Sequence, residues 1–244
     1  MLTLQGVDIV DAGNGYSGTV TKSVLSEGET YKVLTKATDI IGGLYTDGVA
    51  YTQGSDINSS LIPMFVQETL AMFYATDSYA NKIIQMNPNF KWAFIPSVGV
   101  DDKAKYKGYA LSEGTGSYIC NNGNDSRMQG AYEVIKFLAK PENQSFWSQC
   151  TGYVPYTEEA SQQADYVEWM TANFPSLENV KAMLLASPAD LRGPYCTVSN
   201  ALLTSLNQIL SSVCTEPGGD LKGYVEEAEL MLNESIEIEL LRNQ

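Results

Sequence analysis

The chain has 244 residues, of which 44% are hydrophobic and 18% charged, so it holds enough apolar material for a core and is not wholly disordered. Fifteen Lys and Arg stand against 29 Asp and Glu, which gives a formal net charge of −14. This charge disfavours nucleic acid and anionic membranes as partners. No apolar run approaches the ~18 residues of a transmembrane helix, and the polar residues after Met1 do not predict a signal peptide.

The absence of histidine lowers the expectation of catalysis. Without His the chain cannot build Ser-His-Asp or Cys-His catalytic groups or histidine metal sites, and we expect neither a metal nor a cofactor. The four cysteines form no C-x-x-C motif, which argues against zinc ribbons and thioredoxin-type chemistry. Cys196 and Cys214 are predicted near opposite ends of one helix, too far apart for a disulfide. Cys120 and Cys150 either pair or remain buried free thiols, and the second alternative is favoured.

The chain opens with a predicted strand and a glycine-rich stretch. The segment Gly6–Val10 is rich in β-branched residues and predicts the strand. The following stretch matches G-x-G-x-x-G through Gly13, Gly15 and Gly18, a pattern found in dinucleotide sites. Such a site needs a helix to begin in the loop, whereas residues 19–24 alternate as an extended segment does. We therefore interpret the stretch as a glycine-rich turn.

Helices and short strands alternate in the rest of the first half. A capping-box pair, Ser26 and Glu29, opens the first predicted helix. Apolar residues at helical spacing predict helices over 26–45, 57–68 and 77–86. Short apolar runs predict strands over 70–74, 92–96, 109–111 and 117–120.

The second half is predicted to be mainly helical. Its helices are expected over 131–139, 141–150, 157–172, 177–186, 196–213 and 220–241. Strands that come first and helices that close the chain predict an α/β fold class with a mixed sheet.

Four segments in a fixed order carry a family resemblance. They are ETLAM at 68–72, FKWAFIP at 90–96, AYEVIKFLAKPEN at 131–143 and WSQCTGYVP at 147–155. Together they resemble the extracellular solute-binding proteins of bacterial ABC importers, the family of the maltose- and glycerol-3-phosphate-binding receptors. The similarity extends over nearly the whole chain and implies the C-terminal portion of a periplasmic-binding-protein type II-like fold.

The resemblance also implies a domain organisation. Residues 1–113 and 153–244 would form a C-terminal lobe, and 114–152 would cross to an N-terminal lobe that this chain largely lacks. We therefore expect a fragment, a split gene product or one half of a reassembled receptor. Without the missing N-terminal lobe, apolar side chains such as Phe137, Leu138 and Trp147 would be exposed.

The first ligand-binding candidates implied by the resemblance are Thr76, Asp77, Ser78 and Tyr79, in a turn between a predicted strand and helix. The matching turn of the glycerol-3-phosphate receptors is rich in hydroxyls and touches the ligand. Asp77 departs from that pattern, because a carboxylate 4 Å from a phosphate is repelled by ~4 kcal/mol at an effective dielectric of ~20. The same carboxylate would accept sugar hydroxyl protons. The alternative is that Asp77 serves only as a helix N-cap.

The remaining candidates lie further along the chain. Gly114 and Thr115 match a hinge-crossing strand where the ligand approaches the backbone, with a flexible connector as the alternative. Tyr153 matches a tyrosine that lines the cleft, although an isolated tyrosine is more often a core residue. Arg192 and Tyr195 lie where family members bring an arginine or an aromatic residue to the ligand, and Tyr195 aligns with the arginine of the phosphate receptors. That replacement favours stacking on carbohydrate over phosphate binding.

The predicted function is the substrate-binding component of an ABC transporter, which closes about a hinge on a small solute, a sugar or oligosaccharide. Its partners would be that carbohydrate, the ABC permease subunits and the N-terminal lobe. Its location would be extracellular or periplasmic, with the full-length lipoprotein form held at the membrane. We expect no enzymatic activity. The alternatives are a glycoside hydrolase with two carboxylates ~5–9.5 Å apart, a glycerol-phosphate-type receptor, and a stand-alone interaction module.

Overall fold

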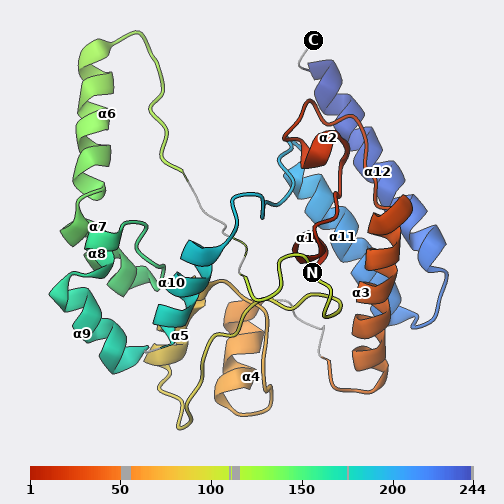
Figure 1. Ribbon diagram of the computed structural model, residues 1–244, viewed down its shortest axis with the longest axis horizontal. Coiled ribbons are helices and arrows are strands. Elements are labelled where there is room, and N and C mark those ends of the chain that lie inside the picture. Colours follow the sequence, from red (N-terminus) through yellow and green to blue (C-terminus); the bar gives the residue numbers. More distant parts are fainter. Residues whose placement is uncertain (51–55, 110, 112–115, 175, 243–244) are drawn as a thin grey trace. The chain divides into compact units, whose positions relative to one another are not determined.

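A computed structural model describes residues 1–50, 56–109, 111, 116–174 and 176–242 (Figure 1). The chain divides into two compact units whose segments alternate along the sequence. Unit 1 comprises Met1–Gln53, Pro96–Ser112 and Ala186–Gln244, and unit 2 comprises Gly54–Ile95 and Glu113–Leu185. Each unit has its own hydrophobic core.

Unit 1 is built around three long helices. α11 packs against both α12 and α3, as Figure 1 shows. Leu34 of α3, Ile209 of α11 and Leu232 of α12 are buried in one core. Burying each such side chain contributes about 1.5–3 kcal/mol. The helices of unit 1 are α1 (Leu2–Gln5), α2 (Asp11–Asn14), α3 (Gly28–Thr46), α11 (Ser199–Thr215) and α12 (Leu221–Arg242).

Unit 2 is built from shorter helices around an aromatic core. Tyr166, Phe174 and Leu177 are buried, and Trp92 stacks on Phe174 with their ring centroids 4.7 Å apart. Its helical elements are η1 (Ile57–Leu61), α4 (Ile62–Val66), η2 (Asp77–Tyr79), α5 (Ala80–Gln85), α6 (Asp125–Leu138), α7 (Pro141–Thr151), α8 (Glu158–Ser161), α9 (Ala164–Asn173) and α10 (Leu177–Ala186).

Helix α6 buries none of its side chains within the described structure. Phe137 and Leu138 on α6 and Trp147 on α7 are exposed, as the sequence predicted for these three residues. None of the described helices is both long enough and apolar enough to cross a membrane.

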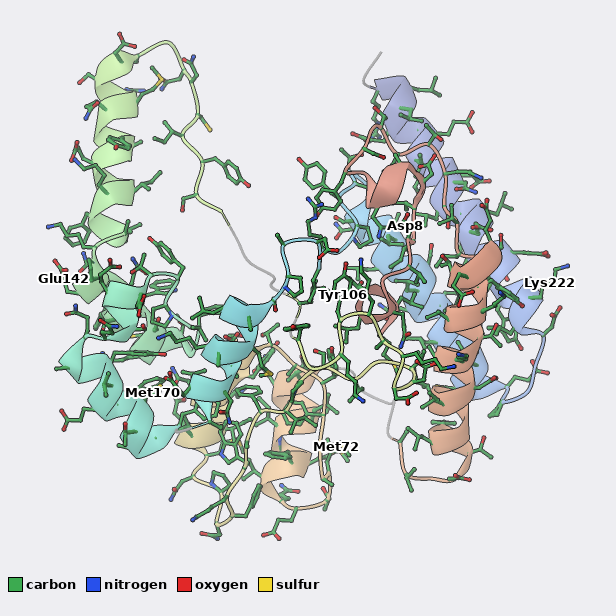
Figure 2. The ribbon with its side chains drawn as sticks, in the orientation of Figure 1. Asp8, Met72, Tyr106, Glu142, Met170 and Lys222 are labelled. Carbon is green, nitrogen blue, oxygen red and sulfur yellow. The ribbon has the colours of Figure 1, made fainter. Side chains whose placement is uncertain are left out.

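The prediction of an α/β fold with a mixed sheet is wrong. Within the described residues, β pairing is limited to an isolated antiparallel bridge between Val10 and Ser23. The apolar run at 92–96 predicted a strand, but Trp92 and Phe94 pack on the ring of Phe174 instead. The run at 70–74 leaves Met72 exposed in a loop (Figure 2). The apolar residues of these runs are accommodated by aromatic packing or left exposed. No neighbouring strand in the described residues pairs with them to form a β ladder.

Most predicted helices are confirmed, with shifted ends. The helix predicted over 26–45 is α3, but its N-cap is Glu27 and no side chain caps it, so the capping box is wrong. The helix predicted over 131–139 begins earlier, because the side chain of Asn124 caps α6 by accepting from the Arg127 N–H at 3.0 Å. Cys196 lies before α11, outside the helix that contains Cys214.

Candidate functional site

The glycine-rich stretch of unit 1 folds as a tight turn held by its own polar side chains. The buried Asn14 accepts hydrogen bonds through Oδ1 from the backbone N–H groups of Ile9 (2.6 Å) and Val10 (3.2 Å). Asp11 accepts from the N–H of Thr21 at 2.8 Å. Ala12, Gly13, Asn14 and Gly15 all have positive φ, so the four-residue element α2 is a left-handed turn and not a right-handed helix whose N-terminus could face a pyrophosphate. The interpretation as a turn is confirmed.

The turn is joined directly to the segment that precedes α11. The backbone N–H of Tyr195 donates to the carbonyl of Asn14 at 2.8 Å. Gly15 has a φ of +84°, and a Cβ at this position would overlap the carbonyl oxygen of Tyr195. Glycine is therefore required twice over, for its backbone conformation and for the close approach of the two segments.

This junction brings Tyr16, Arg192 and Tyr195 together at the surface of unit 1, and we call these three residues the tyrosine–arginine platform. The guanidinium carbon of Arg192 lies 4.0 Å from the ring centroid of Tyr16. The rings of Tyr16 and Tyr195 are tilted by 33° with their centroids 5.8 Å apart. Tyr16 is 44% exposed and Tyr195 72% exposed, so both keep ring surface for another molecule.

The backbone before Arg192 is fixed by a neighbouring polar cluster. The hydroxyl of Tyr106, labelled in Figure 2, donates to the carboxylate of Asp190 at 2.8 Å. Lys105 pairs with the same carboxylate at 2.9 Å. These hydrogen bonds from Lys105 and Tyr106 lower the pKa of Asp190. Leu191 is buried against Leu4 and Tyr106, so the backbone immediately before Arg192 is held in place by packing.

The sequence predicted Arg192 and Tyr195 but missed Tyr16. The signal was present, since Tyr16 stands in a stretch of glycine and small polar residues that cannot bury an aromatic ring. The sequence does not show which segment lies beside Tyr16, because position 16 meets position 192 through tertiary contacts such as the backbone hydrogen bond between Tyr195 and Asn14. The ligand role of Arg192 and Tyr195 remains a prediction.

The remaining described candidates gather in unit 2. Thr76 and Ser78 share a hydrogen bond between their hydroxyls at 2.7 Å, at the start of η2. Gly152 packs against this turn, because a Cβ built on it would lie 3.2 Å from the carbonyl oxygen of Asp77. Tyr153, the next residue, is 45% exposed. The structure thus brings the turn Thr76–Tyr79 together with the Gly152–Val154 segment of the T-G-Y-x-P motif.

Asp77 supplies the carboxyl group of this cluster, and that group is partly buried. Burial raises its pKa, and hydrogen bonds from the backbone N–H groups of Val154 and Ser78 act in the opposite direction. The N-cap of η2 is Thr76, so Asp77 itself is the first residue of the element and not its cap. The remaining two candidates, Gly114 and Thr115, lie outside the described residues.

The described part of the chain contains neither a cluster of metal ligands nor a disulfide. No group of three His, Cys, Asp or Glu side chains there could hold a metal ion. The four cysteines are free, and Cys120 and Cys150 are exposed, so the prediction that this pair is buried is wrong.

Comparison with known proteins places the chain in a family. The family model described as "Bacterial extracellular solute-binding protein" matches residues 3–174, well over half of the chain. This match includes Tyr16, Thr76–Tyr79 and Tyr153, and it ends before Arg192 and Tyr195. No curated protein matches the chain. With a family match of this extent, the chain belongs to the bacterial extracellular solute-binding proteins, whose role is to bind a solute outside the cell for transport.

Proposed function

We propose that this protein binds a saccharide as the substrate-binding component of an ABC importer and delivers it to the membrane permease. The observation that carries the saccharide assignment is the tyrosine–arginine platform, in which two exposed tyrosine rings have centroids 5.8 Å apart and a guanidinium lies over one of them. Aromatic faces cover the C–H faces of sugar rings, while a few fixed polar groups bind the hydroxyls. The family match supports solute binding and transport.

The turn at Thr76–Tyr79 provides a second set of groups suited to hydroxyl-rich solutes. The Thr76 and Ser78 hydroxyls can each donate and accept. The carboxyl of Asp77 adds an acceptor. A phosphate placed at this turn would be repelled by the carboxylate, whereas a sugar hydroxyl would donate to it, so the turn favours sugar hydroxyls over the phosphate of a glycerol-phosphate-type ligand. The same proposal includes the lobe organisation that the resemblance implies. It also includes closure about a hinge on the solute and attachment of the full-length form to the membrane.

Calorimetric titration of the full chain with a panel of neutral and acidic mono- and oligosaccharides tests the proposal. We expect binding heat with at least one member and no turnover of any, because the proposal assigns no catalytic step. Tyr195→Ala should weaken binding by about 10-fold, as expected when an aromatic stacking contact worth ~0.5–1.5 kcal/mol and its buried area are lost. Tyr132→Ala, which removes a half-exposed tyrosine from α6, is the matched control and should bind as the wild type does.

Absence of heat over the whole panel, with a folded protein by circular dichroism, would overturn the saccharide assignment. Equal losses in Tyr195→Ala and Tyr132→Ala would show that the platform is not the contact surface. Hydrolysis of a panel member would instead favour an enzyme.

A further inference from the structure

We propose that the saccharide bound by this protein is acidic, and that Arg192 binds its carboxylate while Tyr16 supports the guanidinium. This inference rests on the proposed function and names the class of solute. It also adds Tyr16 to the site as a residue that positions Arg192. Three observations lead to it, namely the cation–π contact of Arg192 with Tyr16, the lack of an acidic partner for Arg192 among the described residues, and the fixed backbone on both sides of it.

The N–H donors of Arg192 are available for a ligand, since none of them forms a hydrogen bond with another described residue. The guanidinium carbon lies over the Tyr16 ring, 4.0 Å from its centroid. The five N–H donors of Arg192 lie in the guanidinium plane, in a fork that matches the two oxygens of a carboxylate. Tyr16 therefore restricts the orientation of Arg192 without consuming its donors.

Arg192 also differs from the paired cations in this acidic chain. The chain has 29 acidic residues for 15 basic ones, and ion pairs engage cations such as Lys22, Lys105 and Arg242. Across the described residues, no carboxylate forms an ion pair with Arg192. The nearest acidic residue in sequence, Asp190, already accepts from Tyr106 and Lys105.

The platform is held by backbone contacts on both of its segments. The Tyr195 N–H bonds the Asn14 carbonyl at 2.8 Å, and the Asn14 side chain bonds the backbone of Ile9 at 2.6 Å. Before Arg192, the buried Leu191 donates its N–H to the Pro188 carbonyl at 3.0 Å. The N–H donors of Arg192 start from this fixed backbone, so less conformational entropy is lost when they bind a ligand. More of the free energy of their hydrogen bonds then contributes to affinity.

These features fit a sugar ring that carries a carboxylate better than a neutral sugar. The exposed ring of Tyr195 offers a face to the pyranose, and the Arg192 edge offers a bidentate partner to the acid group. A neutral sugar would use the same face but would leave the charged edge to solvent. Hexuronates and the oligosaccharides that contain them are the corresponding chemical class.

The experiment compares matched sugar pairs on the full chain by calorimetry: methyl glucuronide with methyl glucoside, and methyl galacturonide with methyl galactoside. We expect at least one uronide to bind about 10- to 100-fold more tightly than its neutral partner, the range for a charge-assisted hydrogen-bonded pair. Arg192→Gln should remove this preference, because it should weaken binding of the uronide far more than binding of the neutral partner. Arg127→Gln makes the same charge change on α6 and should keep the preference.

Tyr16→Leu tests the positioning role. It should reduce the uronide preference more than the affinity for the neutral sugar, whereas Tyr132→Leu, which removes the ring beneath Lys136 on α6, should change neither. Binding of neutral sugars with no uronide preference would overturn the acidic class and leave the proposed function standing. A preference that survives in Arg192→Gln would overturn the role of Arg192. Absence of binding to every sugar would end both proposals.

Discussion

Replacement of Gly15 by alanine should disrupt the platform more than any ordinary glycine substitution. An alanine at φ +84° costs about 1–2 kcal/mol for the left-handed backbone alone. Its Cβ would also overlap the Tyr195 carbonyl oxygen and stand 3.1 Å from Cγ2 of Val20, so the two segments must separate. Overpacking of this kind costs about 1–3 kcal/mol, which brings the expected loss of unfolding free energy to about 2–5 kcal/mol.

Gly48→Ala is the matched control for this substitution. Gly48 also lies in unit 1 and has a φ of +70°, but a Cβ added there would meet no atom within 4 Å. It should therefore show the backbone cost of about 1–2 kcal/mol and nothing more. Urea unfolding followed by circular dichroism measures both variants. If Gly15→Ala and Gly48→Ala lose the same free energy, within about 0.5 kcal/mol, the close approach of Gly15 to Tyr195 does not exist in solution.

Three further predictions concern polar and titratable groups. Asn14→Ala should lose about 1–3 kcal/mol in urea unfolding because two buried N–H groups lose their acceptor, and Asn14→Asp should recover most of it. Burial raises the pKa of Asp77 above 3.8, so its contribution to the free energy of unfolding is largest below pH 3.8 and is lost as the pH rises through the raised value. Asp77→Asn should remove this part of the pH dependence. If the wild type and Asp77→Asn show the same dependence of unfolding free energy on pH, the raised pKa of Asp77 is refuted. A thiol reagent should label Cys120 and Cys150 at once but the buried Cys214, whose pKa burial raises, only on unfolding, and four equal rates would contradict this.

Helices were predictable because their signal is local. The range predicted over 177–186 coincides with α10, and 220–241 differs from α12 by one residue at each end. In each case, apolar residues recur every three or four positions within a single segment, so no distant partner is needed to define the element.

Strands were not predictable because pairing depends on distant residues. The run at 92–96 has the composition of a strand, yet the rings of Trp92 and Phe94 are partly buried against Phe174, which lies far along the chain. Only the position of that segment decides between a β ladder and an aromatic cluster. The contact of Tyr16 could not be predicted for the same reason, because its partner Arg192 lies far along the chain, in the segment before α11.

Family resemblance supplied what periodicity could not. The T-G-Y-x-P motif indicated Tyr153, and the structure packs Gly152 of that motif against the carbonyl oxygens of Asp77 and Ser78. Neither segment has a hydrophobic pattern that would predict this contact. The mixed sheet was predicted from the order of the apolar runs, and the fold that the resemblance implies also contains one, but β pairing in the described residues is limited to an isolated bridge.

Hydrogen exchange measured by mass spectrometry, with and without a saturating saccharide, tests most directly whether the platform is the binding surface. We expect bound sugar to slow exchange in peptides that cover 12–18 and 191–196, because these segments carry Tyr16, Arg192 and Tyr195. Peptides from the core of α11 should exchange equally in both states. Binding heat without added protection in those two segments would contradict the assignment of the solute to the platform.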